Sequence, residues 1–536
     1  MIQWLILFWL LKDFDLFSVM LRAASLALEA LTVGGVAFLL VAAVPSQIAS
    51  EAIRRLRTLT SWAALALTVV QILAVAVSSA ILIGGSGFSF SDVVTADFFL
   101  WGTLLSVSAF TVFLLMRTSW RRTLFMSAPF AVLVMLSSMG MSHAASRLDH
   151  RAILLLLTGF HHIGSAAWIG AMPFLLIALR REEDLAAARR YTSRFSAMAV
   201  CSVSLLLLGG IGMSLFYVGS WQGLYGTTYG VMLLAKVYLF LVVVGMGAGN
   251  FFLVRRMEHS PAPLLMRLRR FSEAEIGLGF TAILVAASLT SQPPAVDLVH
   301  DRLTTHEIIE RMRWERPRLT SPPFEALAPV TTLKVALQQT LYVGWQNDAN
   351  DRAWSEYNHH WAGLIVLAAG SLALLARRFK WAQSWPLLFI GLAVFIVLRA
   401  DSENWPLGPR SFWASFAAPD VLEHRIYALL ITAFAIFEWA VETGRLKSQS
   451  ASYVFPLLCA AGGALMMTHS HPQANLKDSM LIEMSHTPIA LLGVTAGWSR
   501  WMELRLPQEQ DSKIMSYVWP VCLMLVGIVL LDYREA

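Results

Sequence analysis

Apolar runs of membrane-spanning length alternate with short polar segments along most of the chain. A hydrocarbon core about 30 Å thick needs roughly 20 apolar residues in a helix. Such runs are predicted near residues 16–43, 60–83, 94–116, 123–142, 152–179, 196–219, 230–254 and 275–291, and again near 359–376, 382–398, 421–441, 451–468, 481–499 and 516–532. The pattern predicts an all-α fold, a polytopic membrane helix bundle of about 14 transmembrane helices in two blocks of eight and six.

One sizeable hydrophilic segment separates the two blocks. It runs from Ser291 to Asn358 and is interrupted by several prolines, which stop long helices. We therefore expect three parts: a membrane domain over residues 1–291, an outer, periplasmic linker loop over 292–358, and a second membrane domain over 359–536 whose outer face is rich in histidine and methionine.

The composition excludes a soluble globular protein. Of the 536 residues, 57% are hydrophobic and only 14% are charged, so the polar surface is too small to cover the apolar material. The formal net charge of +6 could suggest a nucleic-acid partner, but many arginines lie in short clusters between apolar runs. Membrane proteins place such clusters in cytoplasmic loops. We therefore expect membrane lipid around the protein and no nucleic-acid partner.

The basic clusters recur in every second loop, which predicts the orientation. Examples are Arg54, Arg55 and Arg57, then Arg117, Arg121 and Arg122, and in the second block Arg377, Arg378 and Lys380. The short loops between them are poorer in basic residues. Because positively charged loops remain in the cytoplasm, both termini are predicted to lie outside.

The sequence shows no sign of thiol chemistry. Cys201, Cys459 and Cys522 each stand alone in an apolar run, which indicates neither a thiolate metal site nor a disulfide framework. The apolar start of the chain has no basic n-region and no small-residue cleavage site, so we expect no cleaved signal peptide. A Walker A loop is also missing, which argues against ATP-driven pumping.

Two adjacent histidines lie well inside one apolar segment. His161 and His162 fall within the run from Asp149 to Arg181, where an imidazole in hydrocarbon is costly and by default marks a site facing the bundle interior. Glu29 in the first span and Lys236 in the seventh are further ionisable groups at membrane depth. Both are candidates for a polar pathway, although Lys236 could instead extend its amine to the membrane interface.

Most of the other histidines fall on the predicted outer side, often next to methionines, and only His259 is predicted to be cytoplasmic. Thioether and imidazole together suit copper, Cu(I) in particular, with Cu(II) as the other oxidation state. The predicted metal ligands are Met139, Met141, His143, His161, His162, His359, His360, His424, Met467, His469, His471, Glu483, Met484 and His486.

One predicted helix could present several of these groups together. Met480, Met484, Glu483 and His486 follow one another at helical spacings that bring them to overlapping faces. The His-Ser-His sequence at 469–471 closes the preceding span, where two imidazoles can converge from a loop.

Two other hypotheses use the same histidines. Histidines on separate membrane helices, for example His424 and His486, could ligate haem in an electron-transfer protein. Alternatively, the second block could be a metal-dependent enzyme or sensor with Glu483 as acid or base, but such chemistry needs an open coordination position that no sequence pattern shows. The methionine clusters and paired histidines favour copper handling over haem binding, and we do not expect an enzyme.

The segment from about Ala152 to Arg256 resembles the copper resistance protein D (CopD) family of bacterial inner-membrane proteins. The resemblance rests on HHIGSAAWIGAMPF, on a helix rich in small residues that ends in SLFYVGSW, and on a Tyr-Gly entry into LLAK. It implies location in the bacterial inner membrane and transport of copper from periplasm to cytoplasm. It also implies a periplasmic copper-binding partner of the copper resistance protein C (CopC) type.

The resemblance also implies roles for particular residues. His161 and His162 match the family's membrane histidine position, and Met139, Met141 and His143 lie where family members often have ligands. The chain departs from the family in two respects. We expect no fused soluble copper-binding domain, and the second block of six helices resembles an extension found in only some relatives.

Overall fold

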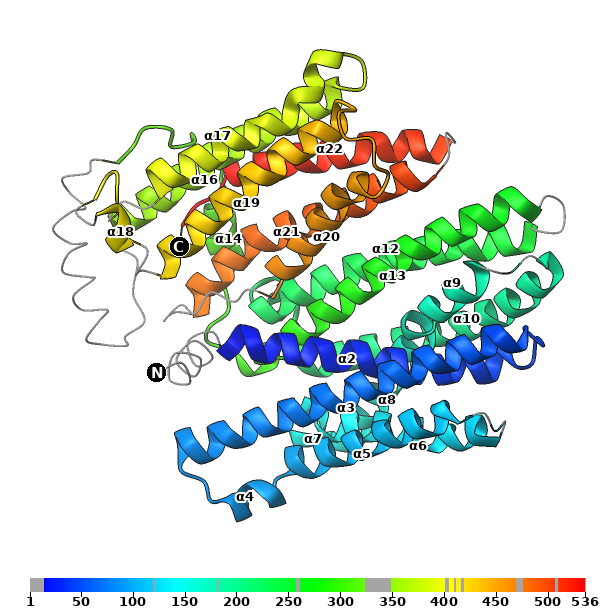
Figure 1. Ribbon diagram of the computed structural model, residues 1–536. Coiled ribbons are helices and arrows are strands. Elements are labelled where there is room, and N and C mark those ends of the chain that lie inside the picture. Colours follow the sequence, from blue (N-terminus) through cyan, green and yellow to red (C-terminus); the bar gives the residue numbers. More distant parts are fainter. Residues whose placement is uncertain are drawn as a thin grey trace. The chain divides into compact units, whose positions relative to one another are not determined.

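The computed structural model describes residues 14–118, 120, 122–180, 182, 184–256, 261–322, 349–400, 404–408, 411–415, 419–468, 476–506 and 510–535. Within these ranges every regular element is a helix (Figure 1). Twelve of the described helices are long and apolar enough to cross a membrane. The predicted all-α, polytopic membrane bundle is therefore confirmed.

Twelve of the fourteen predicted spans correspond to a helix of this kind. The prediction for residues 451–468 corresponds to a shorter apolar helix, Ala451–Met466. The prediction for residues 481–499 falls in α21 (Leu476–Arg505), which has 30 residues but is interrupted by polar groups such as Glu483 and His486.

The chain forms two compact units. Unit 1 comprises residues 1–223 and 232–297, and unit 2 comprises residues 224–231 and 298–536. The break after Asp297 falls inside the predicted linker. This division shows only which residues pack together. It does not test the predicted organisation into two membrane domains and a linker, which stays a prediction.

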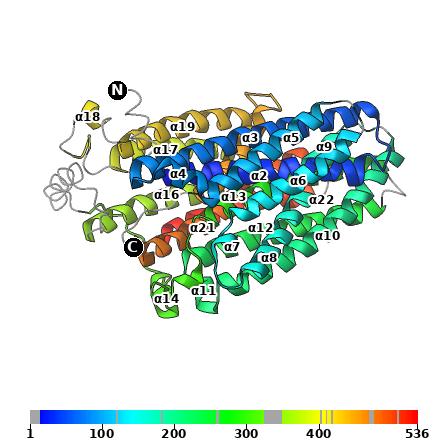
Figure 2. The same cartoon turned by 90° about the horizontal axis from the view of Figure 1, so that it is seen from below.

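Unit 1 contains the first eight membrane-length helices, except that residues 224–231 belong to unit 2. Its elements are α2 (Phe14–Phe38), η1 (Leu39–Ala43), α3 (Ser50–Ser86), α4 (Phe90–Thr95), α5 (Asp97–Arg117), α6 (Arg122–Gly140), α7 (His143–Ser146), α8 (Arg151–Ser165), η2 (Ala166–Gly170), α9 (Met172–Arg180), α10 (Leu185–Tyr217), α11 (Trp221–Tyr225), α12 (Thr228–Arg256), α13 (Pro261–Leu289) and η3 (Ala295–Asp297). Helix α3 packs on α5, α5 packs on α6, and α2 packs on both α3 and α6 (Figure 2). Helix α8 lies against α10, and α13 lies against α2 and α9.

Glycines allow two close helix crossings in unit 1. A Cβ atom at Gly170 of η2 would overlap the backbone of Ala30 in α2, and one at Gly34 would overlap the backbone of Gly170. At the crossing of α8 and α10, a Cβ atom at Gly209 would stand 2.9 Å from the backbone nitrogen of His161. Small residues permit such close approach between membrane helices. The crossings therefore fix the distance from α8 and η2 to α2 and α10.

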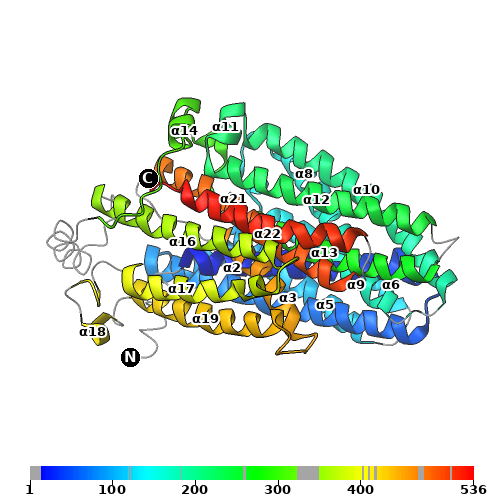
Figure 3. The ribbon, with the colours of Figure 1, turned by 90° about the horizontal axis from the view of Figure 1, so that it is seen from above.

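Unit 2 is built from a smaller set of helices. Its elements are α14 (Thr305–Arg311), α16 (Ala349–Leu375), η4 (Lys380–Leu387), α17 (Leu388–Phe395), η5 (Ile396–Ala400), α18 (Phe412–Ser415), α19 (Pro419–Glu442), η6 (Ala451–Tyr453), α20 (Val454–Met466), α21 and α22 (Gln510–Leu531). Helix α22 packs on α16 and α21, and α17 packs on α19 (Figure 3). Helix α20 packs on α21.

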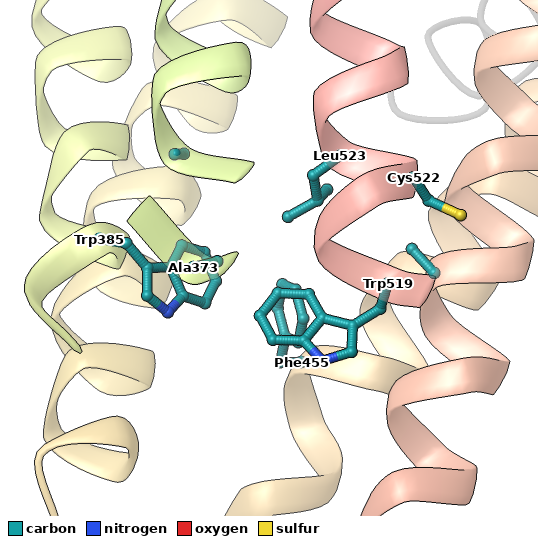
Figure 4. Close-up of a cluster of buried hydrophobic side chains, with 8 residues drawn as sticks. Ala373, Trp385, Phe455, Trp519, Cys522 and Leu523 are labelled. Atoms are coloured by element: carbon teal, nitrogen blue, oxygen red, sulfur yellow. The ribbon is translucent and has the colours of Figure 1, made fainter. Parts of the chain in front are cut away.

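An aromatic cluster forms the core of unit 2. The rings of Trp385, Phe455 and Trp519 come from η4, α20 and α22, and they turn toward one another (Figure 4). Their centroids lie 5.4 to 5.6 Å apart. Two of the three pairs, Trp385 with Phe455 and Phe455 with Trp519, are edge-to-face. Such pairs stabilise by roughly 0.5–1.5 kcal/mol beyond their buried area. The cluster therefore joins three helical segments that are distant in the sequence.

A network of charges surrounds one ring of this core. The Trp519 indole Nε1 donates a hydrogen bond to Glu503 Oε2 at 2.8 Å. The guanidinium groups of Arg377 and Arg500 lie 5.3 and 5.2 Å from the Trp519 ring centroid. Arg500 also pairs with Glu442 at 2.6 Å. Buried charges need such partners, and here each arginine or glutamate of the network has at least one.

A capped helix links the described part of the linker to α21. In α14, Thr304 and Glu307 form a capping box, in which each side chain accepts a hydrogen bond from the other residue's backbone N–H. Lys477 Nζ also donates to Glu307 Oε1 at 2.9 Å. The Thr304 N–H and the Lys477 ammonium favour the ionised carboxylate and lower the pKa of Glu307 to about 2.

Acidification should loosen this link. Because the folded-state pKa of Glu307 lies below its unfolded value, the contact stabilises the fold above the unfolded pKa and is lost as the pH falls toward 2. We expect amide hydrogen exchange in α14, corrected for its intrinsic pH dependence, to accelerate over this range in the detergent-solubilised protein. Glu307→Gln should remove the pH dependence of this exchange. Equal protection of the α14 amides in the wild type at the highest and the lowest pH would contradict the expectation.

Adding one methyl group at the crossing of α2 and η2 should destabilise unit 1. Gly170→Ala places the new Cβ atom in the backbone of Ala30, so the helices must move apart, at a cost of about 1–3 kcal/mol. Gly249→Ala in α12 is the matched control, because a Cβ atom there meets no atom within 4 Å. Thermal unfolding in detergent should show a lower Tm for Gly170→Ala alone, and equal Tm values for the two variants would refute the close crossing.

Candidate functional site

Helix α8 carries the central histidine pair, and the two rings face different neighbours. Successive residues of an α-helix are about 100° apart, because one turn takes 3.6 residues. His161 therefore faces α12, and His162 faces α2. Directly after α8 the backbone continues as a π-helical turn, η2, a feature that is frequent at functional sites.

His162 pairs with the buried carboxylate of Glu29. The distance from His162 Nδ1 to Glu29 Oε1 is 3.4 Å, and Glu29 is only 5% exposed. The crossing of α2 and η2 at Gly34 and Gly170 brings the two helices to this separation. The carboxylate thus has an imidazole partner, which a charge in hydrocarbon requires.

His161 pairs with the amine of Lys236. Lys236 Nζ and His161 Nε2 are 3.1 Å apart. An ammonium group has no lone pair, so it donates and the imidazole Nε2 accepts. The lone pair of this nitrogen is therefore engaged by Lys236, and a metal ion could take it only after the amine had moved or lost its proton.

Two methionine sulfurs lie beside α8 one turn before the histidines. Met139 of α6 packs against Gly159, and the Thr158 hydroxyl donates to Met213 Sδ of α10 at 3.4 Å. Residues 158 and 159 share helix faces with residues 161 and 162, since positions three or four apart are neighbours. Met139 was predicted from its place before His143. Met213 was not predicted, because an isolated methionine in an apolar helix gives no pattern.

The other two predicted ligands of this region have different roles. The Gln71 side-chain amide donates to Met141 Sδ at 3.5 Å, which directs this sulfur toward α3. His143 begins α7, and its Nε2 donates to the Thr290 carbonyl at 2.7 Å. Met141 and His143 thus tie α6 and α7 to neighbouring elements of unit 1.

In unit 2, two predicted histidines meet around a tyrosine. The rings of His359 in α16 and His486 in α21 have centroids 6.4 Å apart. Tyr533, just after α22, stacks on His359 at 3.9 Å and lies edge-on to His486 at 5.8 Å. Three segments of unit 2 therefore converge at this point. Tyr533 was not singled out from the sequence.

Backbone carbonyls fix the tautomer of both rings. His359 Nδ1 donates to the Ser355 carbonyl at 2.8 Å, and His486 Nδ1 donates to the Ile482 carbonyl at 2.9 Å. In each ring this places the in-plane lone pair on Nε2. Metal-ligating histidines usually show this arrangement, with the second nitrogen held by a carbonyl or carboxylate.

His360 has a structural environment. The Arg318 backbone N–H donates to His360 Nδ1 at 2.7 Å, and His360 Nε2 donates to the Tyr533 carbonyl at 2.8 Å. Both ring nitrogens are therefore engaged by backbone groups. His360 holds the chain end and the linker against α16, and in this arrangement it has no lone pair for a metal ion.

The remaining predicted ligands lie apart or outside the described residues. Met467 is buried where α20 ends, Glu483 is buried in α21, and Met484 in α21 and His424 in α19 are half-buried. His469 and His471 fall in the segment 469–475, which the structure does not describe. Within the described ranges, no group of three or more histidine, cysteine, aspartate or glutamate side chains could hold a metal ion.

The buried acid Glu275 escaped the sequence prediction, as did Glu273 and Glu438. Glu275 marks the start of the predicted span 275–291, a position typical of a solvated helix end. The structure begins α13 at Pro261, which places Glu275 in the middle of the helix, where it is 3% exposed. The sequence signal for this earlier helix start was a longer amphipathic pattern, which extends back through Leu268, Leu265 and Leu264.

Comparisons with known proteins point to copper. The model of the family described as Copper resistance protein D matches residues 189–289. The chain is 29% identical over 154 residues to the copper transport protein CutJ of Bacillus subtilis (strain 168), covering 28% of this chain and 27% of that protein. It is 30% identical over 152 residues to Copper resistance protein D of Pseudomonas syringae pv. tomato, covering 26% of this chain and 48% of that protein.

The similarity is partial. In both relatives the matched segment is less than half of the protein's own length. No solved structure matches the chain. The matched residues 189–289 nevertheless include α12 and α13, and thus Lys236, the partner of His161. Through this region the chain is similar to the copper resistance protein D (CopD) family.

Proposed function

We propose that the protein binds copper in the bacterial inner membrane and moves it across that membrane, from periplasm to cytoplasm, in copper homeostasis or resistance. The observation that carries the proposal is the match of residues 189–289 to the Copper resistance protein D family. The two relatives named above are a copper transport protein and a copper resistance protein. In this proposal the chain is a transporter and not an enzyme.

The orientation forms part of the proposal. The arginine clusters predict that both termini are periplasmic. Residues 158 and 159 of α8, which Met213 and Met139 adjoin, then belong to the periplasmic half of unit 1. Copper would meet these thioether sulfurs first and the histidine pair one turn deeper. A periplasmic copper donor of the copper resistance protein C type is proposed as partner on this side, on the basis of the family resemblance.

The polar cluster of unit 1 suits an ion in passage better than a resident ion. His161 Nε2 is engaged by Lys236, and His162 Nδ1 lies beside Glu29. A copper ion that reached these imidazoles would compete with existing partners, which would weaken its binding. Weak binding is what a transport site needs, because an ion that binds too tightly does not leave.

Unit 2 offers the better candidate for a site that retains copper. Both His359 and His486 carry their lone pair on Nε2. The ring centroids lie 6.4 Å apart. Because imidazole nitrogen is a borderline donor that suits Cu(I), we propose Cu(I) as the ion held by this pair.

Removing the pair should remove copper from the protein. We expect the detergent-purified wild type, loaded with Cu(I) under reducing conditions, to retain at least one copper ion per chain that the double variant His359→Phe, His486→Ala lacks. Phenylalanine keeps a ring on Tyr533, so packing is preserved while the ligand is lost. Elemental analysis with an optical spectrum measures copper and haem on the same sample.

His306→Ala is the matched control, since this histidine lies on the exposed surface of α14 and should leave the copper content unchanged. Equal copper in the wild type and the double variant would rule out the pair as a site. A Soret band in place of copper would overturn the copper proposal and favour haem.

A further inference from the structure

Glu275 and Asn250 form a buried polar pair in unit 1 that the proposed copper path does not use. Glu275 in α13 is 3% exposed and Asn250 in α12 is 8% exposed. The Asn250 amide Nδ2 donates a hydrogen bond to Glu275 Oε1. The Asn250 carbonyl oxygen Oδ1 is buried and has no hydrogen-bond donor. The pair therefore lacks one donor hydrogen.

The pair lies near Trp168 of η2, which continues the helix that carries the histidines. A Cβ atom at Gly247 would stand 3.7 Å from Glu275 Oε2 and 3.5 Å from the Trp168 ring. Trp168 follows His162 by six residues, which is roughly 9 Å at 1.5 Å per residue. In the predicted orientation, Glu275 thus lies on the cytoplasmic side of the histidine pair, with Trp168 between.

The charged groups on the elements around Glu275 have other partners. From α9 and α13, Arg180 and Arg270 pair with Glu273 at 3.6 and 2.7 Å. Glu29 of α2 pairs with His162 and is also the acid that acts on Arg22 of α2. Lys236 of α12 pairs with His161, and Arg269 of α13 donates to the Leu179 carbonyl. Arg255 of α12 lies over the Phe251 ring at 4.4 Å. Among the described residues, no ion pair joins Glu275 to a cation.

A proton bound to Glu275 supplies the missing hydrogen-bond donor and also removes the need for a cation beside the carboxylate. An ionised carboxylate buried without a cation is costly, whereas a carboxylic acid is neutral. The same proton makes Glu275 a donor, and it can then supply the hydrogen that Asn250 Oδ1 lacks, while Asn250 Nδ2 continues to donate to the other oxygen. Acid and amide would each be satisfied by two reciprocal hydrogen bonds.

We propose that Glu275, with Asn250 as its hydrogen-bond partner, is a proton-binding site of unit 1 and that it takes up and releases a proton as the metal ion passes. The proton adds to a carboxylate oxygen of Glu275, and its release restores the carboxylate. Proton binding stands on the geometry of the pair. Its coupling to ion movement rests on the proposed transport function.

Infrared spectroscopy tests the proton directly. In the full-length protein near neutral pH, the wild type should show a carboxylic-acid C=O band, shifted in D₂O, that is missing from Glu275→Gln. Glu273→Gln is the matched control, because Glu273 pairs with arginines and should contribute no acid band. Asn250→Asp should retain the band, since two carboxyl groups in contact share a proton. Identical acid bands in the wild type and Glu275→Gln would overturn the proposal.

A flux measurement tests the coupling. In proteoliposomes with an internal pH dye, wild-type copper movement should be accompanied by a proton flux, and Glu275→Gln should lose that flux at least tenfold. An unchanged proton flux in Glu275→Gln would refute the coupling. No copper movement in the wild type would instead refute the proposed function, and the infrared result would still decide whether Glu275 holds a proton.

Discussion

An ionisable side chain placed in hydrocarbon must find a partner, and unit 1 is built around that requirement. Glu29 and Lys236 would each be costly alone at membrane depth, and each instead meets one ring of the adjacent pair His161 and His162. The pairing depends on helix crossings that only glycine permits, at Gly170 and Gly209. The glycines at these helix crossings thus determine which ionisable side chains can pair.

The two units treat histidine differently. In unit 1 the imidazoles are paired with an acid and an amine, so one nitrogen of each ring is already engaged by a charged group. In unit 2 the rings of His359 and His486 are oriented by carbonyls of their own helices, which leaves the lone pair on Nε2. The first arrangement suits transient contact with an ion, and the second suits retention. In the proposed function, this contrast assigns passage of the ion to unit 1 and its retention to unit 2.

The sequence was sufficient for the fold class and for the individual membrane residues. Hydropathy predicted the helices, and Glu29, Lys236 and the histidine pair were recognised as costly at their depth. Their pairing was not predictable, because it depends on which helices cross and at what height. His360 shows the same limit: adjacency to His359 predicted a shared role, but one residue along a helix turns the ring to another neighbour. Tyr533, Met213 and Glu275 escaped notice because each lacks a local pattern.

Copper flux through the purified protein tests the central claim most directly. The full-length chain in proteoliposomes should take up copper, and the double variant His161→Ala, His162→Ala should reduce uptake to the level of empty vesicles. The His306→Ala control should transport as the wild type does. Undiminished uptake in the double variant would contradict the account, because copper would then cross without the histidine pair around which unit 1 is arranged.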